Sequence, residues 1–308
     1  NIRVVDQAEV PRSPVRPNKP MNLLAGLLGG LTAGIGLAFF VGYVDNRIKS
    51  PEELKQLGLT FLGLVPGLTE KDMATGTLPF LRDGVPMSFT EAFSGIRTNV
   101  VFSTAEEGSR SLVVTSSQPG EGKTVVAANL AMSLAQMGQR VLLIDSDMRK
   151  PRQHEIFKMA QDPGLSSLLV GKAKAGDAVR NTTISGLWVL PSGPHPPNPS
   201  ELLGSTRFKD ILTTFSQHFD WVVLDSPPVM AVTDASVIAH RTNGVVFVVG
   251  CEQVSRSLVA NAIEQLLGSK ATIMGAVLNR VNLHRNPHYY SHYYKREYAN
   301  YYTVEKQT

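Results

Sequence analysis

The chain has 308 residues, of which 43% are hydrophobic and 18% are charged, and its formal net charge is +4. This length suits one large domain with appendages or two modest domains, and so small and dispersed a charge predicts no nucleic-acid partner. The single cysteine, Cys251, excludes an intrachain disulfide framework and a four-cysteine metal cluster. Because residue 1 is asparagine rather than methionine, we expect the sequence to be part of a longer protein.

Prolines recur at every third position near the start of the chain, at Pro11, Pro14, Pro17 and Pro20. Three residues per turn is the period of the polyproline II helix, so these rings would share one face of an extended segment. Residues 1–20 are therefore predicted to form a stiff strut.

An uncharged run of 25 residues lies between Lys19 and Asp45. At about 1.5 Å per residue, a helix of this length exceeds the roughly 30 Å hydrocarbon core of a bilayer, which predicts a transmembrane helix over residues 21–44. A cleaved signal peptide would have a shorter apolar region, and a buried core helix would contain some polar residue. Glycines at four-residue intervals suit contact with another membrane helix, and the flanking positive charges are too balanced to set its orientation.

Residues 50–58 are predicted as a short helix and residues 61–67 as a short strand, and a linker then extends to about residue 86. Beyond the linker, apolar strands alternate with helical segments. Helices are predicted at 91–102 and 124–138, and strands at 111–117, 140–147, 187–191, 221–228, 244–250 and 271–281. This alternation indicates an α/β fold with a mainly parallel, doubly wound sheet and helices on both faces.

The segment VVTSSQPGEGKT places a glycine-rich turn between a predicted strand and a predicted helix. Gly120, Gly122, Lys123 and Thr124 match the end of a Walker A loop, although Ser117 replaces the usual first glycine. In such a P-loop, backbone N–H groups hold phosphates, the lysine reaches the outer phosphates, and the hydroxyl ligates magnesium. We predict nucleotide contacts from Ser117, Gln118, Pro119, Gly120, Glu121, Gly122, Lys123, Thr124 and Val125.

Two further predicted strands end in carboxylates. VVLDSPP ends at Asp225 in the Walker B arrangement, in which a carboxylate meets magnesium directly or through water. VLLIDSDMR ends with Asp145 and Asp147, which would face one side at the carboxyl end of the strand, where open α/β sheets bind ligands. A solvated strand end is the alternative, but after a P-loop helix a second acidic site beside the phosphates is the better interpretation.

Seven of the eight tyrosines fall near the C-terminus. Buried structural aromatics would be spread over the core, whereas a segment this close to a terminus is expected to be mobile. From the residues alone, a tail that docks on a partner and a final amphipathic helix both remain open. The seven are Tyr289, Tyr290, Tyr293, Tyr294, Tyr298, Tyr301 and Tyr302.

Together these patterns resemble the bacterial tyrosine kinases of exopolysaccharide export, a family of polysaccharide co-polymerases. The likeness rests on PGEGKT, on LLIDSDMRKP (called Walker A′ in that family) and on VVLDSPP, and it extends to NRIKSPEEL, NPSELL and the tyrosine-rich end. The resemblance implies the family's C-terminal membrane helix plus its cytoplasmic kinase domain, in the bacterial inner membrane. A first membrane helix and a periplasmic domain would then precede residue 1.

The resemblance also implies a reaction. Lys123, Thr124, Asp145, Asp147 and Asp225 would hold ATP and Mg²⁺ and carry phosphoryl transfer, with Thr124, Asp145 and Asp225 as the metal ligands. One Walker A′ aspartate would accept a tyrosine proton, which agrees with the chemistry, because a phenol with a pKa of about 10 is a poor nucleophile at neutral pH. The seven tail tyrosines would be the phosphoacceptors of an autokinase that acts in trans between subunits and regulates polysaccharide polymerisation and export.

A domain order and partners follow from the same resemblance. The domains would be a periplasmic strut (1–20), a membrane helix (21–44), a juxtamembrane linker (45–86), the kinase domain (87–284) and a tail (285–308). The partners would be further copies of the chain in a ring, the inner membrane, the polysaccharide export machinery and a protein-tyrosine phosphatase.

Two positions depart from related patterns. Glu91 and Arg97 fit the family's oligomerisation helix, but Ser94 replaces one of its arginines, which predicts a weaker or differently arranged ring. Related partitioning and septum-site ATPases carry a lysine where this chain has Gln118, so a dimer completed by that lysine is not expected.

Several alternatives stay open from the sequence alone. Asn279 would touch the adenine or be a satisfied strand-end residue, and Ser200 would cap a helix in a loop that the resemblance places near the active site or a subunit interface. His284, His288 and His292 could share a helix face, but no cysteine or carboxylate cluster completes a metal shell, so a solvated segment is preferred. Instead of a kinase, the chain could be a membrane-anchored P-loop ATPase switch or a structural chain-length regulator.

Overall fold

The computed structural model describes residues 17–67, 87–103 and 110–283, without the side chains of residues 41–44. The first sixteen residues of the predicted strut, the seven tail tyrosines and the three-histidine segment lie outside these ranges. The chain divides into two compact units, Asn1–Asn46 and Arg47–Thr308.

The described part of the first unit is dominated by one 26-residue helix, α1 (Lys19–Val44). Its stretch Lys19–Phe40 is apolar and unburied, and within the described ranges it is the one helix long and apolar enough to cross a membrane. By length and composition α1 fits the predicted membrane helix. The resemblance described that helix as C-terminal, which is wrong for this chain: α1 is its N-terminal element, and the folded unit follows it.

The second unit is built on an eight-stranded sheet with the spatial order β1-β8-β7-β2-β6-β3-β5-β4. All neighbouring strands are parallel except β4 and β5, which are antiparallel. The predicted mainly parallel sheet is confirmed. The strands are β1 (Phe61–Pro66), β2 (Arg110–Ser116), β3 (Val141–Asp145), β4 (Arg180–Asn181), β5 (Leu187–Leu190), β6 (Trp221–Asp225), β7 (Gly244–Gly250) and β8 (Ile273–Val281).

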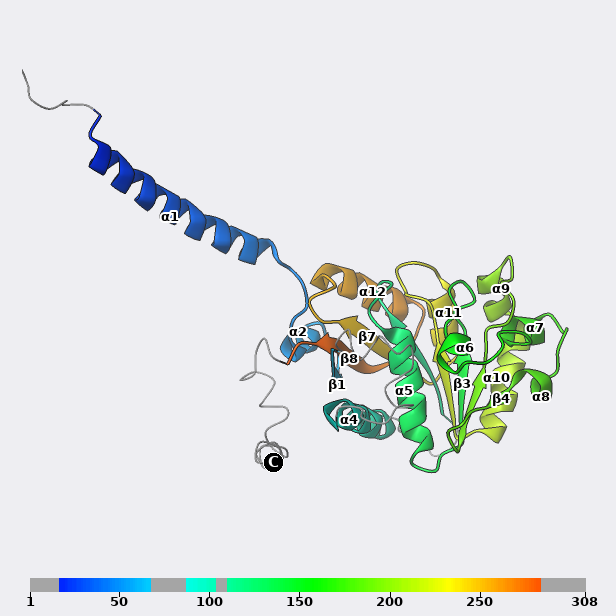
Figure 1. Ribbon diagram of the computed structural model, residues 1–308. Coiled ribbons are helices and arrows are strands. Elements are labelled where there is room, and N and C mark those ends of the chain that lie inside the picture. The colour runs from blue at the N-terminus through cyan, green and yellow to red at the C-terminus, as the bar shows by residue number, and fades with distance from the viewer. Residues whose placement is uncertain (1–16, 68–86, 104–109, 284–308) are drawn as a thin grey trace, which may run out of the picture. The chain divides into compact units, whose positions relative to one another are not determined.

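Helices cover both faces of this sheet (Figure 1). One hydrophobic core lies between the sheet and helices α4 and α5, and the other lies on the opposite face, with α2, α10, α11 and α12. The helices are α2 (Pro51–Gln56), α4 (Met87–Ser103), α5 (Lys123–Ala135), α6 (Gln153–Ile156), α7 (Leu165–Leu169), α8 (Ala175–Ala178), α9 (Pro199–Gly204), α10 (Thr206–His218), α11 (Asp234–Ala239) and α12 (Arg256–Gly268).

Successive residues of the central strands contribute to opposite cores. In β2, Val113 packs on the α10–α12 side, whereas Val114 packs on the α4–α5 side. Every residue of β3, β6 and β7 is buried, because both faces of the sheet are covered, and this is why these strands read as unbroken apolar runs. Since β6 lies between β2 and β3, the glycine-rich turn and the two acidic strand ends meet at one edge of the sheet.

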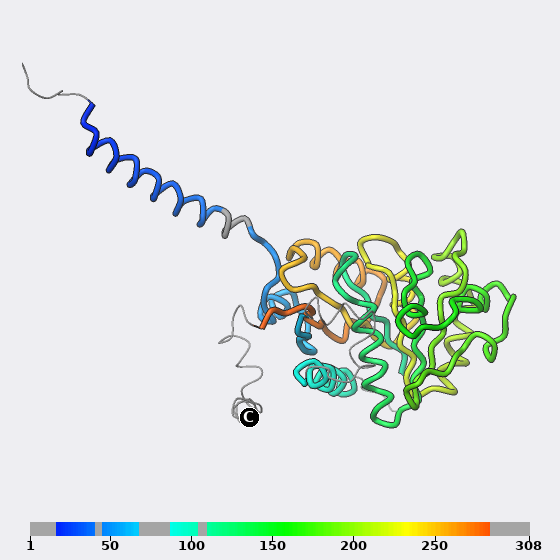
Figure 2. The backbone as a smooth tube through the Cα atoms, in the orientation of Figure 1, coloured from blue at the N-terminus to red at the C-terminus, as the bar shows by residue number. Residues whose placement is uncertain are grey.

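Residues 47–66 lie in the second unit, and the short helix and short strand predicted within the juxtamembrane linker are α2 and β1. β1 pairs in parallel with β8 at one end of the sheet, where the two strands lie side by side (Figure 2). Ile48 is fully buried, and Arg47 forms an isolated antiparallel bridge with Ser255. β1 joins the sheet because its apolar side chains, such as Leu62, are buried between the sheet and the neighbouring helices.

Candidate active site

The glycine-rich turn connects β2 to α5. Gly120 and Gly122 have φ values of 94° and 93°, in the left-handed region that glycine adopts without a steric cost. At Gly122 a Cβ atom would also overlap Nδ2 of Asn279, which lies on β8. Glycine is therefore needed at 122 for both backbone conformation and close packing, and the turn delivers its N–H groups to the start of α5, where P-loops bind phosphates.

Glu121 was predicted among the nucleotide contacts, but its side chain faces the protein interior and is 1% exposed. Its Oε1 accepts hydrogen bonds from Ser117 Oγ at 2.5 Å and from the Gln118 N–H at 2.7 Å, and its Oε2 accepts one from the Gly250 N–H at 2.9 Å. Burial raises the pKa of Glu121, and these donors offset only part of the rise. The Glu121 carboxylate thus connects the glycine-rich loop to the end of β7 through hydrogen bonds.

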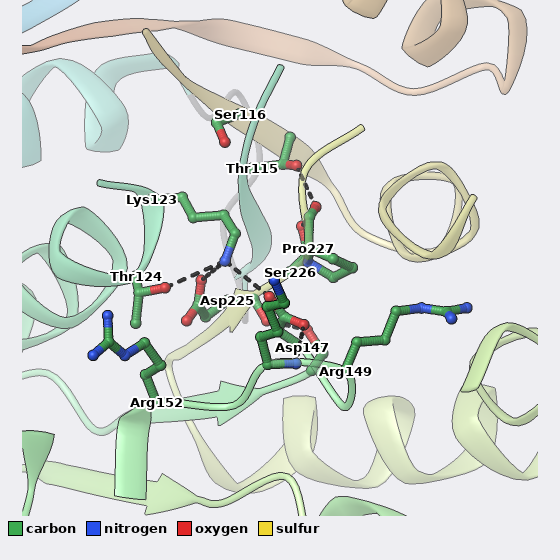
Figure 3. A network of polar contacts seen from close by, with 12 residues as sticks. Thr115, Ser116, Lys123, Thr124, Asp147, Arg149, Arg152, Asp225, Ser226 and Pro227 are labelled. Carbon is green, nitrogen blue, oxygen red and sulfur yellow. Dashed lines mark hydrogen bonds and ion pairs between the residues drawn. The ribbon is translucent and has the colours of Figure 1, made fainter. Parts of the chain in front are cut away.

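Lys123 lies among the acidic side chains (Figure 3). Its Nζ is 3.0 Å from Asp147 Oδ2, 3.8 Å from Asp225 Oδ1 and 3.3 Å from Thr124 Oγ1. Asp147 Oδ1 accepts the Lys150 N–H at 3.0 Å. Burial lowers the pKa of Lys123, but the nearby Asp225 and Asp147 raise it by more, so the net shift is upward and the amine stays charged.

Asp145 and Asp225 are paired in register at the ends of β3 and β6. Asp145 Oδ2 accepts the backbone N–H groups of Arg152 and Gln153 at 3.0 and 2.9 Å, and Asp225 Oδ2 accepts Gln153 Nε2 at 2.9 Å. The other oxygen of each carboxylate, Oδ1, is buried and has no hydrogen-bond partner in the described part of the chain. Buried acceptors without hydrogen bonds are uncommon, and a cation bound between the two carboxylates would satisfy both oxygens.

The electrostatics favour a cation between these carboxylates. Burial raises the pKa of Asp145 well above its usual range, and the charge of Asp225 raises it further. Burial also raises the pKa of Asp225, although Lys123 opposes the rise. Each carboxylate therefore destabilises the other in its charged form, and the single lysine offsets only part of that repulsion.

These residues fit Mg²⁺, which prefers oxygen ligands and in phosphoryl-transfer sites takes one or two carboxylates, with water and phosphate completing its coordination. Asp145 Oδ1 and Asp225 Oδ1 offer two oxygens without a hydrogen bond, and the Thr124 hydroxyl at the start of α5 offers a third oxygen. Among the described residues there is no cluster of three or more His, Cys, Asp or Glu that could hold a metal by itself.

A second polar cluster fixes the loop that follows β3. Arg149 donates from Nε and Nη2 to the two oxygens of Asp234 at 2.9 and 3.1 Å, and its Nη2 lies 3.2 Å from Ser200 Oγ. Ser200 also hydrogen-bonds to Asp234 Oδ1. Ser200 lies inside α9, whose cap residue is Asn198, so the predicted capping role is wrong. It instead joins α9 to α11 and to the acidic loop.

Other predicted site residues lie elsewhere. Asn279 donates from Nδ2 to the Glu121 carbonyl at 2.7 Å, so it holds the P-loop from β8, and contact with adenine stays a prediction. Arg97 on α4 donates to the carbonyl and hydroxyl of Ser133 on α5 at 3.0 and 3.1 Å within the same chain. Glu91 is half-buried on α4. The oligomerisation role of Glu91 and Arg97 also stays a prediction.

Sequence reasoning missed two residues. Arg149 lies inside the quoted motif LLIDSDMRKP, and a cation so close to two aspartates could have drawn attention to it. Gln153 has no signal in the sequence, because its contacts reach β3, β6 and α5, which are distant along the chain.

Comparisons with known proteins identify the family. A profile of an AAA domain matches residues 109–273, and a profile of a G-rich domain on tyrosine kinases matches residues 1–41. Tyrosine-protein kinase YwqD of Bacillus subtilis (strain 168) is 38% identical over 200 residues, which cover 65% of this chain and 84% of YwqD. The chain belongs to the bacterial tyrosine-protein kinase family.

Solved structures agree with this membership. The chimerical protein CapA2B2 matches with a TM-score of 0.69 and 39% identity, covering 76% of this chain and 100% of that one. The kinase domain of Escherichia coli tyrosine kinase ETK matches with a TM-score of 0.70 and 31% identity, covering 76% and 95%. Full-length etk of Escherichia coli (strain K12) is 31% identical over 91% of this chain, which spans only 41% of the etk length.

Proposed function

We propose that this chain is an ATP- and Mg²⁺-dependent protein-tyrosine autokinase that phosphorylates its own tail tyrosines in trans and thereby regulates exopolysaccharide polymerisation and export. The observation that carries the proposal is the pair of buried oxygens without a hydrogen bond, Asp145 Oδ1 and Asp225 Oδ1, beside Lys123 at the start of α5. Membership of the tyrosine-protein kinase family supports the reaction. The apolar helix α1 supports attachment to the inner membrane, with the kinase domain in the cytoplasm.

In this proposal the nucleotide phosphates bind to the backbone N–H groups of the turn between Ser117 and Thr124. Lys123 moves from Asp147 toward the outer phosphates, and Asp145, Asp225 and Thr124 hold the metal. When bound, Mg²⁺ neutralises charge that develops on the transferred phosphoryl group.

Asp147 is the better candidate for the proton acceptor. Asp145 is fully buried, and two backbone N–H groups fix its Oδ2. Asp147 lies beyond the end of β3, keeps a side-chain exposure of 5%, and has its Oδ2 bound to Lys123. Once Lys123 turns to the phosphates, this oxygen can take the phenol proton as the tyrosine oxygen bonds to the γ-phosphorus and the bond to the ADP oxygen breaks.

The oligomeric state, the export machinery and a phosphatase partner are part of the same proposal and rest on the family resemblance. The test mixes two variants of the chain: Lys123→Met with its tail intact, and an otherwise unchanged chain cut after Asn286. Phosphotyrosine on the Lys123→Met chain supports transfer between subunits. Labelling only when site and tail share one chain, at a rate independent of concentration, would contradict it. ATP hydrolysis with no phosphotyrosine on either chain would favour the ATPase switch.

A further inference from the structure

We infer that Gln153 is a positioning residue of the metal site, which aims the carboxylates of Asp145 and Asp225 and fixes them to the start of α5. The inference rests on the proposed function, because it concerns the same Mg²⁺ and nucleotide site. Gln153 does not belong to the Walker A, Walker A′ or Walker B patterns.

Gln153 connects three separate parts of the site. Its backbone N–H binds Asp145 Oδ2 at 2.9 Å, and its side-chain Nε2 lies 2.9 Å from Asp225 Oδ2 and 3.2 Å from the Thr124 carbonyl. The residue is fully buried. The side chain of Gln153 therefore joins the Walker B strand to the first turn of the P-loop helix, and its backbone N–H adds the Walker A′ carboxylate Asp145.

The direction of these bonds determines which oxygens stay available. Both partners of Nε2 are acceptors, so both amide hydrogens are donated and the orientation of the amide is fixed by chemistry. Donation to Asp225 Oδ2 leaves Asp225 Oδ1 without a hydrogen bond, 3.8 Å from Lys123 Nζ, and donation from the backbone of Gln153 to Asp145 Oδ2 leaves Asp145 Oδ1 without one. The same two oxygens are the ones assigned above to Mg²⁺.

The remaining atom of the amide strengthens the assignment. Gln153 Oε1 is buried and has no hydrogen-bond partner among the described residues. A glutamine that served packing alone would leave an acceptor desolvated at a cost, which an apolar residue of the same length would avoid. Beside a hydrated cation, the free oxygen can instead accept a hydrogen bond from water. A glutamate could not replace it, because it would add another negative charge next to Asp145 and Asp225 and would lack the donor that Asp225 Oδ2 accepts.

The test uses the full-length chain in detergent with Gln153→Met, which keeps the length of the side chain but removes its donors and acceptor. Gln161→Met is the matched control, because Gln161 donates to the Gly193 carbonyl and lies outside the cluster of Asp145, Asp147 and Asp225. Binding of a fluorescent ADP is measured in EDTA and over a range of Mg²⁺ concentrations, and phosphorylation is measured separately as kcat and KM.

For Gln153→Met we expect an unchanged ADP affinity in EDTA, and a Mg²⁺ concentration for half-maximal enhancement that rises about 10- to 100-fold, as when groups that orient metal ligands are removed. In the phosphorylation assay, kcat should fall by a larger factor than the KM for ATP changes. Gln161→Met should match the parent. The inference is overturned if Gln153→Met keeps the parental Mg²⁺ dependence, or if it loses ADP affinity equally with and without Mg²⁺, which would indicate a structural role. A parent chain that binds no ADP, or binds it without response to Mg²⁺, would contradict the proposed function itself.

Discussion

Replacing Asp145 by asparagine should stabilise the metal-free protein while removing its response to Mg²⁺. The asparagine oxygen can still accept the backbone N–H groups of Arg152 and Gln153 that now bind Asp145 Oδ2. Its amide takes the place of the unpartnered Oδ1. The variant therefore keeps the local hydrogen bonds and removes one buried negative charge.

The size of the effect follows from the neighbouring charges. Asp145 and Asp225 are paired in register on adjacent strands, which lie about 5 Å apart. At an effective dielectric constant of about 20, two like charges at that distance repel by about 3 kcal/mol. The parent relieves part of this by binding a proton, so we expect a net gain of about 1–2 kcal/mol in the free energy of unfolding. For a domain of this size that corresponds to an increase in Tm of about 2–8 °C.

The gain should depend on pH. Because the folded-state pKa of Asp145 is raised, the folded parent holds that proton more tightly than the unfolded chain does. The stability that this proton gives the folded parent is fully present below the pKa of Asp145 in the unfolded chain, and it is lost as pH rises through the pKa in the folded protein. The free energy of unfolding of Asp145→Asn should therefore exceed that of the parent by more at pH 8 than at pH 5. Thermal unfolding in EDTA measures this difference.

Asp220→Asn is the control for the same chemical change. Arg140 lowers the pKa of Asp220 through a hydrogen bond and its charge, so this stability is present above the unfolded pKa and is lost as pH falls through the folded pKa. Arg140 is exposed and Asp220 is partly exposed, so solvent screens the pair and its loss should change the free energy of unfolding little. If Asp145→Asn were less stable than the parent at pH 8, or if its gain were independent of pH, the reasoning about buried carboxylate repulsion would fail.

Three further changes test other parts of the structure. Gly122→Ala should weaken ADP binding strongly, because its Cβ would overlap Asn279, whereas Gly120→Ala, with nothing within 4 Å of its Cβ, should weaken it less; equal effects would contradict the packing argument. Arg149→Ala leaves the buried Asp234 without its counter-charge; because Arg149 is 40% exposed and Ser200 still donates to Asp234, the free energy of unfolding should fall by about 1–3 kcal/mol, part of which Asp234→Asn should restore. Phe93→Ala should cost about 3–5 kcal/mol, while Ala at the 81% exposed Phe102 on the same helix should stay within about 0.5 kcal/mol.

The sheet and the phosphate loop were predictable because their signals are local. Apolar runs such as that of β7 indicate strands covered on both faces. The glycine-rich turn could be placed because the strand before it and the helix after it are each predicted from their own residues. Interactions between distant segments were not predictable. The inward turn of Glu121 depends on the Gly250 N–H, which is far along the chain. The strand β1 was itself predicted, but it was assigned to the juxtamembrane linker, because its pairing with β8 joins segments that are distant in the sequence.

The acidic motif shows the same limit at a finer scale. Alternation along a strand correctly brought Asp145 and Asp147 to one site, but β3 ends at Asp145, and Asp147 lies in the loop beyond it. There Asp147 is held by Lys123 and by the Lys150 N–H. The alternation pattern predicted where the two carboxylates lie, whereas their different hydrogen-bond partners are known only from the structure.

The most direct test of the central claim is the intact mass of the full-length chain before and after incubation with ATP and Mg²⁺, followed by mapping of the modified peptides. The account predicts several phosphoryl additions, all within the segment that holds Tyr289 to Tyr302, and none in Lys123→Met. An unchanged mass in a chain that binds and hydrolyses ATP, or phosphate confined to residues outside the tail, would contradict it.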